Sequence, residues 1–414
     1  MTFGKRLETF DGIGPGFDHL RIGLAISILS WHSFGLSYGA DWVKTVPTVL
    51  LALLALLLPM FFGLSGFLVM GSAMRTNHAG TFITFRFLRI FPALFVEVML
   101  SAVVLGGFVT TLSLGQYYSS SQFFEYFGLL IGSIKYFLPG VFDTNPIKTV
   151  NGALWTVGPE IACYCFVAAM MVCGLFIRKL PMVLVTVLLV MICIVADYWE
   201  TDWNTVHLPI KALVVSFVSG NIIYLYRYTI EYRLSFFVLA VVVSVAAITL
   251  AQNYVALRPC FYIAALLIPY CSAYIGLTNF KPLPFFSRGD YSYGIYIYGF
   301  PIQQAITFYF PDSRIWWFNL ALSLPLTIFF AVLSWHFIEK PVLGLRKKFI
   351  PSQPRKVSQP SIPQFNLRNI AVLTTIAVYG LFVTNAARVF PFKGIFYSII
   401  GKHNASATPT LEQF

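Results

Sequence analysis

The sequence predicts an all-α polytopic membrane protein. Of its 414 residues, 58% are hydrophobic and only 11% are charged, and 41 Phe and 22 Tyr are present. A soluble protein of this length needs more charge to cover its surface, whereas aromatic residues gather at the interfaces of a bilayer. The chain also contains a series of apolar runs near the length of about 20 residues that a transmembrane helix requires.

Eleven runs are predicted to be transmembrane helices. They cover residues 18–39, 47–73, 90–114, 152–177, 180–197, 208–226, 234–251, 260–278, 291–310, 316–338 and 369–387. The first ten are expected to form a membrane core over residues 1–345. A basic, Pro-rich linker (346–368), one additional C-terminal helix (369–387) and a short tail (388–414) are expected to follow. The first helix is expected to stay uncleaved, because no A-x-A-like signal-peptide site accompanies it.

The distribution of basic residues predicts the orientation. Counted on alternate sides of the helices, 19 Lys and Arg fall on the side of the N-terminus and 9 on the other. The positive-inside rule then places the N-terminus in the cytoplasm and the C-terminus outside. The same rule explains the net charge of +12 without a nucleic-acid partner. All six Cys lie in apolar runs without zinc-like spacing, so no metal site is expected.

Two residues of the first run indicate a functional site inside the membrane. In FDHLRIGLAISILSWHSFGL, Arg21 and His32 are 11 residues apart. That is close to three helical turns, so both side chains share a face and lie about 16 Å apart along the axis. Charged and titratable groups within a membrane are functional by default. A snorkelling arginine and a helix-packing histidine are the alternative, which the shared face disfavours.

FRFLRIFPAL predicts a second cationic site. Arg86 and Arg89 are expected to open the third helix, with Pro92 in its first turn. The i, i+3 spacing brings the two guanidinium groups together, and a helix N-terminus also favours anions. Ordinary positive-inside anchoring explains the same pair. Because the site faces the cytoplasm, it would suit a phosphate-bearing cosubstrate.

NGALWTVGPEIACYCF (151–166) is predicted to begin the fourth helix and places Glu160 several residues into the span. Its neighbours about one turn away are Trp155, Thr156 and Tyr164. A buried carboxylate needs a cation or a proton. We therefore expect Glu160 to pair with Arg21 or to orient His32, the alternative being a structural ion pair between helices.

Two later blocks and one loop complete the candidate set. GDYSYGIYIYGFP (289–301) carries hydroxyl groups at helical spacing, on Ser292, Tyr293, Tyr296 and Tyr298. An interfacial tyrosine belt would give a similar pattern. In SWHFIEKP (334–341), Glu339 is expected to close the tenth helix before Pro341 and to hydrogen-bond His336. The long aromatic outer loop over 115–151 is expected to hold an acceptor site or a re-entrant segment.

Taken in order, these blocks resemble the membrane acyltransferase 3 family, whose members transfer acyl groups, commonly acetyl, to sugars and other hydroxyl acceptors. The resemblance covers residues from about 15 to 345 and rests on the Arg/His pair, the Arg-x-x-Arg pair, NGALWT with its Glu and Tyr, the Ser-Tyr-Gly-x-Tyr block and FIEKP. It implies a ten-helix core that receives acyl-CoA from the cytoplasm. It also implies catalysis by His32 with Arg21, and CoA phosphates near Arg86 and Arg89.

This chain departs from relatives at two places. Many members have a His where this chain has Gly299, so a second catalytic imidazole is not expected there. Some members carry a hydrolase-like domain after an extra helix. Fewer than 30 residues follow position 387 here, so no such domain is expected.

The predicted reaction is O-acetylation of a surface or secreted glycan, or its lipid-linked precursor, from acetyl-CoA at a bacterial inner membrane. His32 is expected to act as general base, tuned by Glu160 or Glu339, while Arg21 steadies the oxyanion or pyrophosphate. An acyl-His32 relay is the alternative route. Further acyl-CoA contacts are expected from Ser292, Tyr293 and Tyr296; acceptor or structural roles are expected for Trp155, Thr156, Tyr164 and Glu339. A transporter or flippase for a lipid-linked or polar substrate, using the same polar face, is the alternative, and it is less favoured because no inverted repeat is present. A sensor or scaffold without turnover is the third hypothesis.

Overall fold

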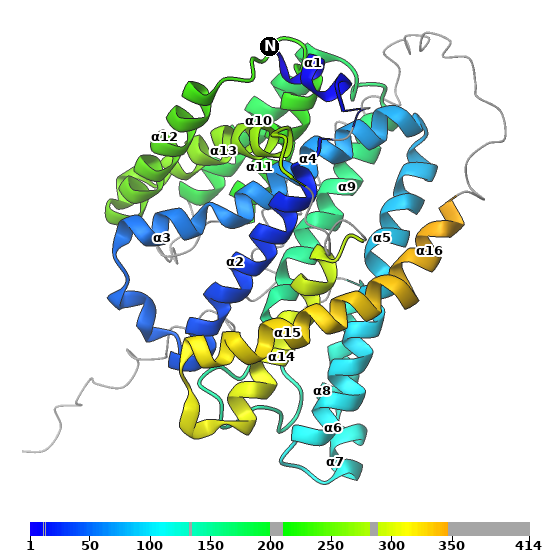
Figure 1. Cartoon of the computed structure of the whole chain (residues 1–414), viewed down its shortest axis with the longest axis vertical. Helices are drawn as coiled ribbons and strands as arrows, with labels where there is room; N and C mark the ends of the chain where they lie inside the picture. Colours follow the sequence, from blue (N-terminus) through cyan, green and yellow to red (C-terminus); the bar gives the residue numbers. More distant parts are fainter. Residues whose placement is uncertain (11, 13, 132–134, 199–209, 282–288, 347–414) are drawn as a thin grey trace, which may run out of the picture.

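The chain folds into a bundle of α-helices, shown in Figure 1. The computed structural model describes residues 1–346 except 11, 13, 132–134, 199–209 and 282–288. Its helices are α1 (Phe3–Glu8), α2 (Phe17–Tyr38), α3 (Thr48–Ala55), α4 (Leu57–Thr76), α5 (Ala79–Met99), α6 (Gly106–Val109), α7 (Leu114–Ser119), α8 (Ser121–Tyr126), α9 (Val157–Val172), α10 (Lys179–Tyr198), α11 (Ile210–Leu225), α12 (Leu234–Asn253), α13 (Cys260–Gly276), α14 (Ser292–Tyr309), α15 (Trp316–Ser334) and α16 (Lys340–Gly344).

Six helical stretches of the described residues are long and apolar enough to cross a membrane. They are Thr48–Thr76, Ala79–Val109, Gly152–Val172, Lys179–Asp197, Leu234–Asn253 and Trp316–Gly344. The helices α11 and α13 are apolar but shorter. The prediction of an integral, all-α membrane protein is confirmed, whereas the count of ten helices plus one stays a prediction. The helix at 369–387, the tail at 388–414 and all of the linker except residue 346 lie outside the described residues.

Two predicted helices differ from the observed ones. The helix predicted over 47–73 is divided into α3 and α4 at Leu56. The helix predicted to begin at residue 90 begins at Ala79, because the side chain of His78 accepts a hydrogen bond from the backbone N–H of Thr81 (3.2 Å) and caps α5. Pro92 therefore lies inside α5 and not in its first turn, where it was predicted.

Glycines allow α4 and α11 to touch along their backbones. A Cβ atom added to Gly66 would overlap the carbonyl oxygen of Phe217, and one added to Gly220 would overlap that of Gly63. Membrane helices often associate through such small residues, because close approach gives them van der Waals contact that lipid cannot replace. Of the helix pairs in the described structure, α4 and α11 make the most extensive contact.

The predicted outer loop is partly helical and supports a π-helical segment (Leu100–Leu105) that continues α5. The hydroxyl of Tyr117 donates to the carbonyl of Ala102 (2.6 Å), and that of Tyr118 donates to the carbonyl of Val103 (2.7 Å). These tyrosines give two backbone carbonyls of the π-helical segment a side-chain partner and attach the loop to it. At least these aromatic residues of the loop therefore have a structural role.

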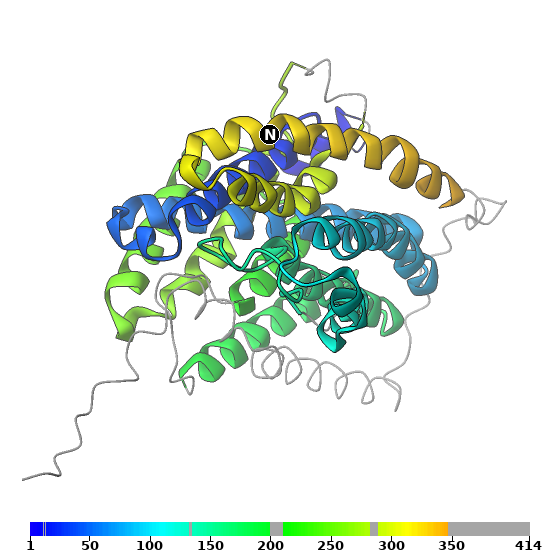
Figure 2. The same cartoon turned by 90° about the horizontal axis from the view of Figure 1, so that it is seen from below.

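Helices from distant parts of the sequence surround the candidate site. The helix α14 packs against α2 and α15, while α9 packs against α4 and α5. Figure 2 shows α14 to α16, coloured yellow to orange, on one side of the bundle and the green helices on the other. A second π-helical segment (Trp335–Glu339) joins α15 to α16 and packs against α5. This junction places the FIEKP motif next to α5, the helix that carries the predicted arginine pair.

Candidate active site

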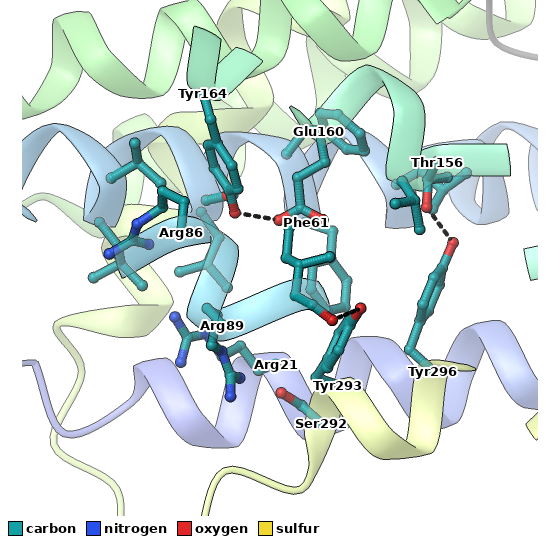
Figure 3. Close-up of a pocket in the computed structure, with 18 residues that line it drawn as sticks. Arg21, Phe61, Arg86, Arg89, Thr156, Glu160, Tyr164, Ser292, Tyr293 and Tyr296 are labelled. Carbon is teal, nitrogen blue, oxygen red and sulfur yellow. Dashed lines mark hydrogen bonds between the residues drawn. The ribbon is translucent and has the colours of Figure 1, made fainter. Parts of the chain in front are cut away.

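A pocket lies between α2, α4, α5, α9 and α14, and it encloses about 910 Å³ including its open mouth. Figure 3 shows three arginines towards one end and Tyr296 with Thr156 at the other. Polar groups are contributed by Arg21, Ser65, Arg86, Arg89, Thr156, Glu160, Tyr164, Ser292, Tyr293 and Tyr296. Apolar walls are contributed mainly by α4, through residues such as Leu58, Phe61, Phe62, Leu64 and Leu68. The pocket therefore combines a cationic end with apolar walls.

Two of the arginines are held by a partly buried charge network. Arg21 and Arg89 both donate to Oδ2 of Asp290, at 3.0 and 2.6 Å, and Arg89 also donates to Oε2 of Glu339 at 3.0 Å. The hydroxyl of Ser292 donates to the other oxygen of Asp290 at 2.6 Å. Burial raises the pKa of Asp290, but Arg89 and Arg21 outweigh this effect and hold it at about 2. Asp290 is therefore a carboxylate that fixes both arginines.

Arg86 has no ion pair among the described residues. Its Nη2 donates to the hydroxyl of Ser72 at 3.0 Å, and its guanidinium lies 5.7 Å from the ring centres of Phe82 and Tyr164. Its Nε is buried without a hydrogen-bond partner. The predicted helix N-terminus at this arginine is wrong, because α5 begins two turns earlier at Ala79. Arg86 thus offers charge and a free N–H, without help from a helix dipole.

Glu160 has a different partner from those predicted. Its Oε1 accepts a hydrogen bond from the hydroxyl of Tyr164, one turn later on α9 (Figure 3). Neither an ion pair with Arg21 nor a hydrogen bond with His32 is present among the described residues, so both expected pairings are wrong. The hydrogen bond that the structure shows for this carboxylate therefore comes from its own helix.

Tyrosines of α14 bind the backbone of neighbouring segments. The hydroxyl of Tyr293 donates to the carbonyl of Ile90 (3.0 Å). That of Tyr296 lies 2.9 Å from the carbonyl of Ala153 and 2.7 Å from the hydroxyl of Thr156. This last contact marks the end of the pocket farthest from Arg86 (Figure 3).

His32 lies beyond the pocket and does not line it. It is on α2 about 16 Å from Arg21 along the helix axis. Its ring meets that of Phe300 edge-on at 5.1 Å, and it has no hydrogen bond or ion pair within the described part of the chain. Phe300 follows Tyr296 by one turn of α14. At Gly299 an added Cβ would come within 2.5 Å of Leu29, so helix packing fills the place of the absent second imidazole.

Three other predicted features differ from the structure. Trp155 packs against the hydrophobic core and does not line the pocket. His336 contacts the carbonyl of Val332 at 3.0 Å, so its predicted bond to Glu339 is wrong. The helix does not stop at Pro341, because α16 continues to Gly344 and Pro341 occupies its first turn.

Two carboxylates were not predicted. Asp290 stands at the start of the GDYSYG block, and the need of buried arginines for counter-charges is the signal that points to it. Glu97 lies within a predicted span and is fully buried. The rule that intramembrane ionisable residues are functional by default points to this residue as it does to Glu160.

Known proteins match the chain over most of its length. A family model described as an acyltransferase domain matches residues 15–336. An O-acetyl transferase of Shigella phage Sf6 is 25% identical over 345 residues, which are 79% of this chain and 95% of that protein. Nodulation protein 10 of Rhizobium leguminosarum bv. viciae is 27% identical over 372 residues, which are 84% of this chain and 98% of that protein.

No solved structure matches the chain. The family model nevertheless spans the pocket, the arginine pair, His32 and the turn that carries Thr156. The chain therefore belongs to the acyltransferase 3 family of membrane enzymes.

Proposed function

We propose that this enzyme moves an acetyl group from cytoplasmic acetyl-CoA to a hydroxyl of a surface or secreted glycan, or of its lipid-linked precursor. The match to a protein named O-acetyl transferase supports the acetyl donor and an oxygen acceptor. The orientation with a cytoplasmic N-terminus, in a bacterial inner membrane, rests on the 19 to 9 distribution of basic residues. Residues 1–345 would form the transferase core, and 369–387 an additional helix before an extracytoplasmic tail.

The observation that carries the proposal is the pocket with Arg86 at its cationic end. Arg89 and Arg21 already bind carboxylates, whereas Arg86 has none among the described residues. A phosphate of CoA would supply the missing anion and accept charge-assisted hydrogen bonds from the guanidinium. The apolar walls suit the thioester arm, and Ser292, Tyr293 and Tyr296 lie along it.

His32 would remove the proton from the acceptor hydroxyl, and the resulting oxygen would attack the thioester carbonyl carbon. The tetrahedral intermediate then expels CoA as a thiolate, which takes the proton from the imidazolium of His32. In the alternative relay, the acetyl group is first carried on His32. Because Tyr296 and Thr156 end the pocket one turn before Phe300, the acetyl group would have to pass them to reach His32.

The other predicted residues have supporting roles in this proposal. Arg21 is held by Asp290, so it would fix the charge network and stand near the pyrophosphate. Glu339 would fix Arg89 in the same way. Glu160 and Tyr164 would shape the pocket wall next to Arg86. Trp155 packs against the core and would support the turn before α9.

The test follows acetyl transfer in membranes that contain wild-type protein, His32→Ala or the matched control His336→Ala. His336 is exposed, hydrogen-bonds only within its own helical stretch among the described residues and stacks on Tyr291, outside the pocket, which makes it a suitable control. Membranes receive isotope-labelled acetyl-CoA, and the glycan fraction is examined by NMR for O-acetyl esters. We expect transfer by wild type and the control, and a loss of about a hundredfold or more in His32→Ala. Full transfer by His32→Ala at equal protein levels would refute the catalytic role. A wild-type protein that transfers nothing from acetyl-CoA would refute the donor.

A further inference from the structure

A carboxylate outside the pocket holds a second polar network. Glu97 lies on α5 with its side chain fully buried. Its Oε1 accepts from the hydroxyl of Ser101 (2.7 Å) and from the side-chain amide of Asn151 (2.8 Å), while Oε2 has no partner among the described residues. No described cation pairs with it. A carboxyl group in such a place costs several kcal/mol in a membrane. A specific role for its hydrogen bonds would explain its presence.

Asn151 connects this carboxyl to two other segments. Its side-chain amide also donates to the carbonyl of Ile297 on α14 (2.8 Å). Its side-chain oxygen accepts from the backbone N–H of Ala153 (3.1 Å) and begins a short 3-10 helix, Gly152–Thr156. We call residues 151–156 the NGALWT turn. Glu97 thus anchors the residue that caps this turn.

The NGALWT turn contacts both parts of the proposed reaction path. On one side, the carbonyl of Ala153 accepts from the hydroxyl of Tyr296 at the end of the pocket (2.9 Å). On the other side, Gly152 packs against Phe300, since an added Cβ would lie 2.8 Å from its ring. Phe300 is the residue that touches His32. A shift of this turn would therefore move the pocket wall and the surroundings of His32 together.

We propose that Glu97 is a positioning residue, which holds the NGALWT turn between the donor pocket and His32 through its hydrogen bond to Asn151. It touches neither the pocket nor His32 and acts through the turn. The kinetic part of this inference rests on the proposed function. The structural part, that Glu97 keeps the NGALWT turn ordered, does not depend on the proposed function.

Two substitutions of similar size separate the hydrogen bond from packing. Glu97→Gln keeps an oxygen that can accept from Ser101 and Asn151, whereas Glu97→Met fills the space without an acceptor. Hydrogen–deuterium exchange of the full-length protein in detergent measures how well the backbone amides of residues 151–156 are protected. We expect exchange there to be about tenfold faster in Glu97→Met, which cannot accept a hydrogen bond from Asn151, and unchanged in Glu97→Gln, which can. Exchange of α11, which has no extensive contact with α5 in the described structure, should be unchanged in both.

Steady-state kinetics of the same variants provide a second test. We expect Glu97→Met to lower kcat about tenfold, with KM for acetyl-CoA within about twofold of wild type, because Arg86 and its surroundings are untouched. Glu97→Gln should restore kcat. Wild-type exchange of residues 151–156 in Glu97→Met, or acceleration throughout α11 as well, would overturn the inference. A wild-type enzyme without acetyl transfer would overturn the proposed function instead, and the exchange result would still decide the role of Glu97.

Discussion

Arg21 and Arg89 donate to the same carboxylate oxygen, although they belong to different helices, α2 and α5. Oδ2 of Asp290 lies 3.0 Å from Nη1 of Arg21 and 2.6 Å from Nη2 of Arg89. Asp290 comes from the turn before α14, so one side chain joins three segments. Like-charged guanidinium groups would repel each other without it. The cationic end of the pocket therefore depends on a residue that does not line it.

Replacing Asp290 by Asn should destabilise the protein strongly. The substitution leaves Arg21 and Arg89 close together, with Glu339 beside Arg89 and only the exposed Asp18, at 3.8 Å, beside Arg21. Losing the hydrogen bonds between a carboxylate and two partly buried guanidinium groups costs about 2 kcal/mol. The melting temperature of the purified protein in detergent should fall by several degrees. Glu125→Gln is the control, because its pair with Lys135 (3.3 Å) is about half exposed and should contribute under about 1 kcal/mol. Equal melting of both variants would contradict the importance of the network.

The loss of stability caused by Asp290→Asn should become smaller at low pH. The pKa of Asp290 in the folded protein, about 2, is lower than its usual 3.8. Its stabilising contribution is therefore complete above the usual value and is lost as the pH falls towards the folded one. The difference in melting temperature between wild type and Asp290→Asn should be constant between about pH 5 and pH 8 and should narrow below about pH 4. A difference that stays the same from about pH 5 down to about pH 2 would show that Asp290 is not the ionised partner described here.

Arg86 should govern the affinity for the donor. Arg86→Ala removes the guanidinium that has no carboxylate partner among the described residues, and KM for acetyl-CoA should rise about tenfold or more with a smaller change in kcat. Arg86→Lys should restore only part of the affinity, because an ammonium lacks the planar fork. Initial rates over a range of acetyl-CoA concentrations provide the measurement. Arg75→Ala, at an exposed arginine outside the pocket, is the control and should keep the wild-type KM.

Gly66 should tolerate no side chain. In Gly66→Ala the new methyl group would overlap the carbonyl oxygen of Phe217, a backbone atom that cannot rotate away. Overpacking of this kind costs about 1–3 kcal/mol. The control is Gly23→Ala on α2, where nothing lies within 4 Å of the added atom. Thermal unfolding in detergent should show a loss for Gly66→Ala and no loss for Gly23→Ala, and similar losses would argue against backbone contact between α4 and α11.

The membrane fold was predictable because apolar length alone marks a spanning helix. The ranges expected for α10 and α12 differ from the observed ones by two residues or fewer at each end. The start of α5 was missed because a histidine cap, His78, is a rare signal beside the usual Ser, Thr, Asp and Asn. The break at Leu56 precedes Pro59, which lies in the first turn of α4 and cannot donate a backbone hydrogen bond to Ala55. The local sequence therefore does carry a signal for this break, which the prediction of one helix over 47–73 overlooked.

The members of the pocket were easier to predict than their partners. Local spacing identified Arg86, Arg89 and Glu160, and the structure places all three around one pocket. Pairing depends on which helices meet, which spacing does not encode. Glu160 was expected to pair with Arg21. Instead, Tyr164 on the same helix donates a hydrogen bond to Glu160, and Arg21 pairs with Asp290.

The glycine contact between α4 and α11 has a consequence for motion. The helix α4 supplies the apolar wall of the pocket, and at Gly66 and Gly220 its backbone is pressed against that of α11. Backbones in direct contact have no side chains between them that could change rotamer and let the helices slide. We therefore expect this wall to be the part of the pocket that moves least. An opening of the pocket is then expected to come from the other helices that line it, α2, α5, α9 and α14.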